Sequence, residues 1–240
     1  FEEGRFSMEE IHRFTNEGVS FYAADRSGHC TEKIIWDDIA IYANIIEALR
    51  IYRRDVAEQL DSVAVDTWGS DFQLMSPDGE RLGDMYAYRD HRLDDAVESL
   101  RASMDPDRIY ELTGIHFQFY NLSGQLLWLI KNRRHMLLNG AHVLPTASLF
   151  TWYLSGERAV DSTLASVTQL MDAASGEWSE EILCALEIPA SLLPPIVPAG
   201  SIVGSLTPRL ADSVRLNPAK VVAIGHDTAC AFAAAPVDDP

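Results

Sequence analysis

Apolar positions along the chain form one long helical pattern and several short strand-like runs. The helical pattern follows Trp36, where apolar side chains recur at three- and four-residue steps: Ile41, Ile45, Leu49, Tyr52, Val56 and Leu60. This spacing predicts an amphipathic helix whose N-cap is Asp37 or Asp38. We predict a half-exposed strand before it, at 9–14, and an apolar strand directly after it, from Ser62. Strand, helix and strand in this order favour a right-handed crossover and a sheet with some parallel pairing.

The rest of the chain predicts further short elements. Ser76-Pro77-Asp78-Gly79 follows the apolar run 72–75 and predicts a hairpin turn, because proline presets one dihedral angle and glycine supplies the positive one. Asn139-Gly140 predicts a helix stop. Helices are predicted at 93–104, 107–113, 122–134, 147–154, 178–186 (opened by Ser179) and 211–216, strands at 201–206 and 220–224, loops at 16–36 and 86–92, and a rigid connector at 192–200.

Two apolar runs end in polar residues that suit a binding site. The run from Ser62 leads into Asp66-Thr67-Trp68-Gly69 and then Asp71, and the run 220–224 leads into Gly225-His226-Asp227-Thr228. In an open α/β sheet, ligands bind just beyond the carboxyl ends of the strands. A second interpretation stays open for each stretch. Trp68 could simply pack in the core after a tight turn, and Asp227 could cap a helix.

The second strand end carries the clearer candidate for catalysis. Asp227 could act as a general base, accepting the proton of a sugar hydroxyl as that oxygen attacks a phosphoryl group. A hydrolase is disfavoured, because neighbouring His226 and Asp227 do not converge as a triad requires and no GxSxG motif supplies a nucleophile. The spacing of His29, Cys30 and His91 matches no metal-binding motif.

Composition and charge narrow the function classes. The chain has 240 residues, of which 47% are hydrophobic, and a formal net charge of −17. This charge disfavours a nucleic-acid partner, which needs clustered Lys and Arg. No apolar run reaches the roughly 18 residues of a membrane span. The three cysteines form no disulfide or metal pattern, which suits a reducing cytoplasm. A glycine-rich phosphate loop of the GxxxxGK[ST] or GxGxxG kind is also missing from the sequence.

With both strand ends identified, the chain resembles the N-terminal domain of the FGGY family of carbohydrate kinases, and within that family the rhamnulokinases. The resemblance runs in order through nearly the whole chain. The matching residues are Ile11-His12-Arg13-Phe14, Val65-Asp66-Thr67-Trp68-Gly69, Asp71-Phe72, Tyr88-Arg89-Asp90, Arg92, Tyr110, Thr113-Gly114-Ile115, Phe117, Asn121, Gln125-Leu126, Leu144-Pro145, Leu154-Ser155-Gly156, Thr168-Gln169-Leu170 and His226-Asp227-Thr228-Ala229.

The resemblance implies an α/β fold of the actin-like, ribonuclease-H-like kind, with a mixed sheet flanked by helices, as the first domain of a two-domain kinase. It implies ATP- and Mg²⁺-dependent phosphorylation of the C1 hydroxyl of a ketose, most specifically L-rhamnulose. Asp227 would be the catalytic base, and the substrate-binding residues would be Gly69, Trp68, Asp71, His226 and Thr228. Asp66 would be a structural or orienting carboxylate.

The same resemblance predicts how the chain divides. Residues 1–222 would be the sugar-binding domain without its first strand, and residues 223–240 the start of the nucleotide-binding domain. The segments that contact ATP in such kinases have no counterpart in this sequence. We therefore expect the 240 residues alone to bind ATP weakly or not at all and to lack turnover.

Three stretches depart from the rhamnulokinase pattern. They are the run from Gln118 to Gly124, Thr146 after Pro145, and Asp161-Ser162-Thr163-Leu164. Because polar groups are lost there, L-fuculose, xylulose or another ketose remain alternatives, as does a non-catalytic binding or assembly module of the same fold.

Overall fold

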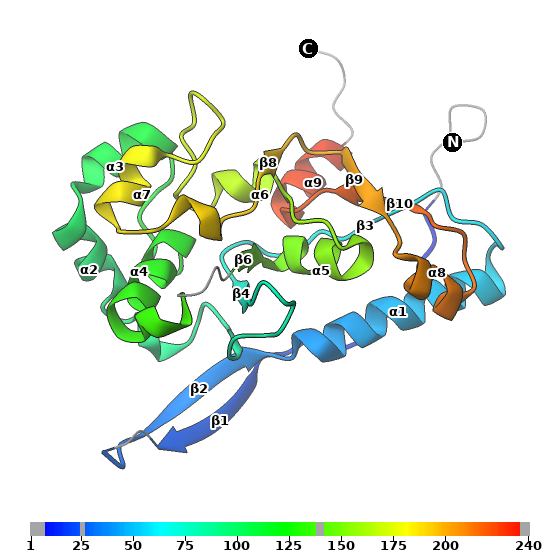
Figure 1. The fold of residues 1–240 in the computed structure, drawn as a ribbon, viewed down its shortest axis with the longest axis horizontal. Helices are drawn as coiled ribbons and strands as arrows, with labels where there is room; N and C mark the ends of the chain where they lie inside the picture. Colours follow the sequence, from blue (N-terminus) through cyan, green and yellow to red (C-terminus); the bar gives the residue numbers. More distant parts are fainter. Residues whose placement is uncertain (1–7, 25–26, 138–141, 236–240) are drawn as a thin grey trace.

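A computed structural model describes residues 8–24, 27–137 and 142–235. Helices α2, α3, α4 and α7 gather at one end of the molecule, α1 and α8 lie at the other, and α5 lies between them (Figure 1). The strands are β1 Val19–Ala24, β2 Cys30–Trp36, β3 Ser62–Ala64, β4 Phe72–Met75, β5 Met85–Tyr86, β6 His142–Pro145, β7 Val160–Asp161, β8 Ile196–Val197, β9 Ser201–Ser205 and β10 Lys220–Ala223. The helices are α1 Asp38–Asp55, α2 Ala96–Ser103, α3 Pro106–Thr113, α4 Leu122–Arg133, α5 Thr146–Ser155, α6 Ser162–Ser166, α7 Glu180–Ala185, α8 Pro208–Val214 and α9 Asp227–Ala234, with 3₁₀ turns η1 His91–Leu93, η2 Arg134–Met136 and η3 Ala190–Leu192.

The sheet that matters for function has the order β3-β10-β9. β10 runs parallel to β3, with Lys220 opposite Ser62, and antiparallel to β9. The predicted mixed sheet is therefore confirmed. Parallel pairing is confirmed as well, but it joins β3 to β10 rather than to a strand at 9–14. Because β3 and β10 are parallel, their carboxyl ends lie at the same edge of the sheet.

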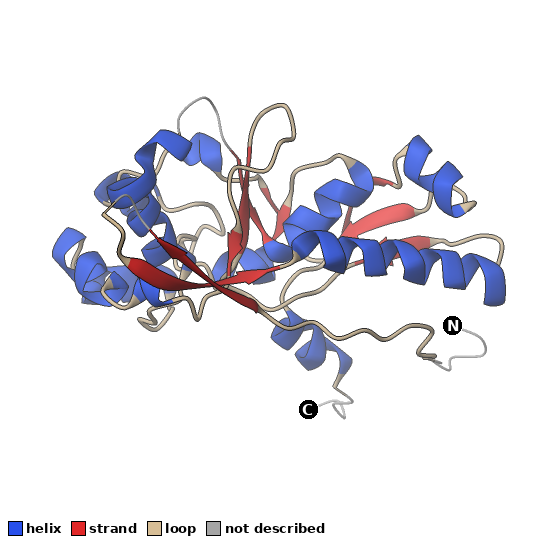
Figure 2. Cartoon of the chain, turned by 90° about the horizontal axis from the view of Figure 1, so that it is seen from below, coloured by secondary structure: helices blue, strands red, loops and turns tan. Residues whose placement is uncertain are grey.

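The N-terminal part differs from the sequence prediction in two ways. Residues 9–14 form no strand, and the side chain of His12 lies 3.1 Å from Asn44 of α1. The predicted loop 16–36 contains a hairpin, in which β1 pairs antiparallel with β2 from Val19–Ile35 to Ala24–Cys30. Figure 2 shows this hairpin extending away from the long helix α1. Most side chains of β1 are exposed and most of β2 are half-buried, and none in either strand is fully buried, so burial leaves little periodic pattern in the sequence.

Most predicted helices are confirmed, within a few residues at their ends. Asp37 caps α1, accepting a hydrogen bond from the Ala40 amide at 2.9 Å, and Ser179 caps α7. The predicted helix 93–104 begins only at Ala96, after the 3₁₀ turn, and α8 begins three residues before its predicted start at 211. The predicted turn at Pro77-Asp78-Gly79 is also confirmed, with Gly79 at φ +84°. The predicted helix stop at Asn139-Gly140 lies outside the described residues.

Helix α5 is the central element of the core. It contacts β10 and β9 on one side and β4 and β6 on the other. Seven of its ten residues are buried, which explains why its sequence is apolar nearly all round. One large core cluster lies beyond it among α2, α3, α4 and α7, and another joins α1 and α8 to β10. Helix α5 and the α1–α8 cluster therefore pack against the sheet whose carboxyl edge carries the polar strand ends.

Candidate functional site

The two polar strand ends lie side by side at the carboxyl edge of β3 and β10. Thr67 and His226 form a parallel bridge beyond the strands. The Thr67 amide donates to the Gly225 carbonyl, and the Asp227 amide donates to the Thr67 carbonyl, each at 3.0 Å. These backbone bonds fix the Trp68-Gly69 stretch against the His226-Asp227 stretch.

A pocket of about 720 Å³ opens at this junction. Its walls come from five separate parts of the chain. The lining residues are Trp68, Gly69, Ser70, Tyr88, Arg89, Ile115, His116, Gln118, Phe119, Tyr120, Asn121, Val167, His226 and Asp227. Aromatic faces, amides and hydroxyls in one opening suit a small polyhydroxylated ligand.

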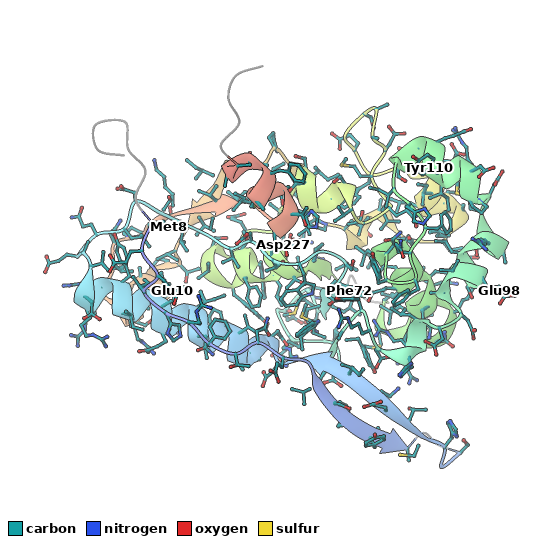
Figure 3. All side chains as sticks on the ribbon, turned by 180° about the vertical axis from the view of Figure 1, so that it is seen from behind. Met8, Glu10, Phe72, Glu98, Tyr110 and Asp227 are labelled. Atoms are coloured by element: carbon teal, nitrogen blue, oxygen red, sulfur yellow. The ribbon has the colours of Figure 1, made fainter. Side chains whose placement is uncertain are left out.

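Asp227 presents an accessible carboxylate to this pocket. It is the first residue of α9 and lies toward the centre of the molecule (Figure 3). Its side chain is 53% exposed; Oδ1 accepts a hydrogen bond from the Thr228 amide at 2.6 Å and lies 3.7 Å from His226 Nε2. A helix does begin here, but its N-cap residue is His226. Since α9 does not bury the carboxylate, Asp227 is free to accept a proton from a ligand hydroxyl.

Two glycines allow the pocket walls to approach closely. A Cβ atom on Gly69 would lie 3.1 Å from Val167 Cγ2 and 3.5 Å from the imidazole of His226, and both of these residues line the pocket. A Cβ on Gly225 would lie 2.0 Å from Asp161 Oδ2, which leaves no room for any side chain. Asp161 is itself buried, where its carboxylate caps α6. Gly225 is thus required for the strand end to reach the site.

Asp71 does not line the pocket, contrary to its predicted place on the wall. It is 1% exposed and lies behind Trp68. Its Oδ2 accepts hydrogen bonds from the indole N–H of Trp36 at 2.7 Å and that of Trp68 at 2.8 Å, while Oδ1 has no partner among the described residues. Burial raises the pKa of Asp71 to about 6, and the two indole donors oppose this rise. The structure therefore places Asp71 as the support that orients Trp68.

Two further predicted residues lie near the pocket without lining it. Thr228 is exposed on α9, where its hydroxyl donates to Asp227 Oδ1 at 3.2 Å. Asp66 is exposed beyond β3 and lies outside the pocket. The pKa of the Cys230 thiol is raised by burial first and then by the charge of Asp66. The charges of Asp161 and Asp227 also raise this pKa, so Asp66 and Asp227 both act on Cys230 although only Asp227 lines the pocket.

Sequence reasoning missed part of the pocket wall. Ser70, His116 and Val167 were not selected as site residues, and no local motif marks them. Tyr120 and Asn121 also line the pocket, and Gln125 of the same region is buried behind the wall. The stretch 115–121 reaches the pocket only through tertiary packing, which periodicity does not reveal.

The described residues contain no recognisable cluster of metal ligands and no motif for nucleotide phosphates. No group of three or more His, Cys, Asp or Glu side chains that could hold a metal occurs in the part of the chain that the structure describes. No described helix is long and apolar enough to cross a membrane. The sequence also contains no glycine-rich phosphate loop.

Comparison with known proteins identifies the family. Residues 25–234 match the model of the N-terminal domain of the FGGY family of carbohydrate kinases. The chain belongs to this family. Among its FGGY relatives is a rhamnulokinase from Bacteroides thetaiotaomicron, 32% identical over 240 residues, which are 100% of this chain and 47% of that protein. A rhamnulokinase from Bacillus subtilis is 31% identical over 235 residues, covering 98% of this chain and 46% of that protein. The chain thus spans just under half the length of these relatives.

Solved structures confirm the predicted fold class. Xylulose kinase from Rhodospirillum rubrum superposes with a TM-score of 0.75 at 21% identity, covering 87% of this chain and 44% of that one. Plasmodium falciparum glycerol kinase with ADP gives a TM-score of 0.73 at 18% identity, covering 87% of this chain and 46% of that one. The FGGY chain therefore has the actin-like, ribonuclease-H-like fold.

Proposed function

We propose that the protein containing this chain transfers a phosphoryl group from ATP to the C1 hydroxyl of a ketose, most specifically L-rhamnulose, giving the ketose 1-phosphate and ADP. The observation that carries the proposal is the exposed Asp227 carboxylate at a polar pocket, in a chain that matches rhamnulokinases over nearly its whole length. ATP and Mg²⁺, like a cytoplasmic location and the division of the chain at 222/223, stay predictions from the family resemblance.

The chain's own residues would act on the sugar. A carboxylate oxygen of Asp227 accepts the proton of the C1 hydroxyl as the hydroxyl oxygen of the sugar becomes the nucleophile. The negative charge thereby passes from the carboxylate to the sugar oxygen. The indole of Trp68, oriented by Asp71, offers an apolar face to the sugar ring or chain. His226 lies 3.7 Å from Asp227 and can orient both the carboxylate and the substrate.

Two of the three stretches that depart from the rhamnulokinase pattern lie away from the pocket, which supports L-rhamnulose as the substrate. Thr146 is buried, and its hydroxyl donates to the Asp71 carbonyl at 3.1 Å, away from the pocket. Asp161 is also buried, at the start of α6. Only the stretch from Gln118 to Asn121 lines the pocket. L-fuculose and xylulose therefore remain the alternatives to test, since this one stretch can alter the fit.

The test is a coupled assay of ADP release by the complete protein with L-rhamnulose, L-fuculose, xylulose and glycerol, with the product identified by ³¹P NMR. We expect the highest kcat/KM with L-rhamnulose and a phosphomonoester at C1. ADP release that no sugar stimulates would contradict the proposal. Tight ketose binding by calorimetry without turnover would instead favour the non-catalytic binding module.

A further inference from the structure

One buried amide connects two walls of the pocket. Gln125 lies in the first turn of α4 and is 1% exposed. Its Nε2 group donates one hydrogen bond to the Ser70 carbonyl at 2.8 Å and another to the Tyr120 carbonyl at 3.0 Å. Ser70 and Tyr120 both line the pocket, yet they belong to segments that are 50 residues apart in the sequence. The two hydrogens of one NH₂ group therefore set the spacing between these walls.

Arg92 holds this amide in one orientation. Its Nη2 donates to Gln125 Oε1 at 2.7 Å. Burial lowers the pKa of Arg92 from its ordinary value, but the neighbouring Asp90 opposes this shift, and Asp90 Oδ1 lies 3.4 Å from Arg92 Nη1. A guanidinium has donors only, so the oxygen of the amide must face it. The NH₂ group is consequently left to face Ser70 and Tyr120.

The same arginine reaches the third wall and the β1–β2 hairpin. Its Nη1 donates to the Ala87 carbonyl at 3.4 Å, next to the lining residues Tyr88 and Arg89. Asp90 Oδ2 accepts a hydrogen bond from the Ile34 amide of β2 at 2.8 Å. The guanidinium also lies 4.3 Å from the ring centroid of Tyr86. Three wall segments are thus attached to one buried cation and one amide.

The wall at Ser70 needs such a restraint. Ser70 has φ +80°, a conformation that costs about 1–3 kcal/mol for a residue with a side chain and persists only where its surroundings hold it. Its carbonyl is bound by Gln125, and the next residue, Asp71, is anchored by Thr146 and the two indoles. Loss of the Gln125 bond would let the turn relax into or away from the pocket.

We propose that Arg92 and Gln125 are positioning residues that set the width of the sugar pocket and so its selectivity among ketoses. Neither is assigned a contact with the substrate. The inference rests on the proposed function, because it assumes that this pocket takes the sugar.

The experiment compares two buried glutamines in the complete protein. Gln73 is 0% exposed, and its Nε2 also donates to two carbonyls, those of Leu74 and Gly83, which lie outside the sugar pocket. We expect both Gln125→Met and Gln73→Met to lower the melting temperature. Only Gln125→Met should raise the calorimetric Kd for L-rhamnulose, by about tenfold, since it removes two hydrogen bonds between the walls. Its ratio of kcat/KM for L-rhamnulose to that for L-fuculose should fall, while KM for ATP stays unchanged.

Arg92→Lys provides a second measurement if Gln125→Met does not fold. Lysine keeps a cation beside Asp90 but lacks the planar fork that reaches Asp90 and Gln125 together, so we expect the same loss of ketose selectivity. Unchanged Kd and selectivity in these variants, or equal losses in Gln73→Met, would overturn the inference while leaving the proposed function intact. Failure of the wild-type protein to bind any ketose would overturn both.

Discussion

Asp71 is a carboxyl group whose environment favours its neutral form. Burial raises its pKa to about 6, above the ordinary 3.8 of an unfolded chain, so the native state binds the proton more tightly than the unfolded state does. The contribution of Asp71 to the free energy of unfolding therefore decreases as the pH rises from about 4 through about 6. Two pKa units correspond to about 3 kcal/mol.

Asp71→Asn should remove this pH dependence. Asparagine keeps an oxygen that can accept the indole hydrogen bonds, but it does not ionise. We expect the free energy of unfolding of the variant, relative to that of the wild type, to rise by about 2 kcal/mol between pH 4.5 and pH 7.5, since the unfolded chain is already largely ionised at the lower pH. Urea unfolding at the two pH values measures this difference. An equal difference at both would show that Asp71 ionises in the native state as it does in the unfolded chain.

Gly69→Ala should impair binding more than stability. The added methyl group would lie 3.1 Å from Val167 and close to His226, at the point where the two strand ends meet. We expect the Kd for L-rhamnulose to rise about tenfold, equivalent to about 1.4 kcal/mol. Gly204→Ala is a matched control, because its Cβ would also meet a side-chain carbon at 3.1 Å, but outside the pocket. Equal effects of both variants on Kd would remove Gly69 from the site.

At the scale of elements, the ends of helices could be predicted where a cap or a proline marks them, and the exposed strands could not. Asp37 and Ser179 mark the starts of α1 and α7 because each side chain satisfies a free backbone amide. The β1–β2 hairpin was missed because neither strand has a fully buried face that would give an alternating pattern. Residues 9–14 show the opposite error, since an alternating pattern forms a strand only beside another strand with free backbone groups.

The first turn of helix α1 holds an ion pair in which only the carboxylate is buried. Asp38 is fully buried, its Oδ1 lies 2.6 Å from Arg81 Nη2, and burial raises its pKa. Removing Arg81 would leave this carboxyl without its cation.

We expect Arg81→Met to lower the free energy of unfolding at pH 7.5 by about 3 kcal/mol, because the fully buried Asp38 carboxylate would lose its partner cation, although Arg81 itself is 34% exposed. Arg108→Met is the control. Arg108 also pairs with a carboxylate, Glu181, at 2.7 Å, but both side chains are nearly half exposed, so its loss should cost less than about 1 kcal/mol. Chemical denaturation compares the two, and equal costs would show that the Asp38 pair is no stronger than a surface pair.

At the scale of the whole molecule, the two strand ends could be predicted as a site because parallel strands bring their carboxyl ends together. Trp68, Gly69, His226 and Asp227 do line one pocket. The remaining walls come from distant segments that carry no recognisable motif, and their arrangement depends on α4 and its buried Gln125. The resemblance predicted Asp71 as a substrate-binding residue, whereas the strained turn at Ser70 directs Asp71 inward.

The most direct measurement compares Asp227→Asn with Asp66→Asn in the complete protein, recording kcat for phosphorylation and the calorimetric Kd for L-rhamnulose. Both carboxylates follow parallel strands, but only Asp227 lines the pocket. We predict that Asp227→Asn lowers kcat by about 10³-fold, within the range for loss of a general base, and leaves Kd within about threefold of the wild-type value. Asp66→Asn should keep most of the rate. An Asp227→Asn enzyme with more than about a tenth of the wild-type kcat would show that Asp227 is not the catalytic base.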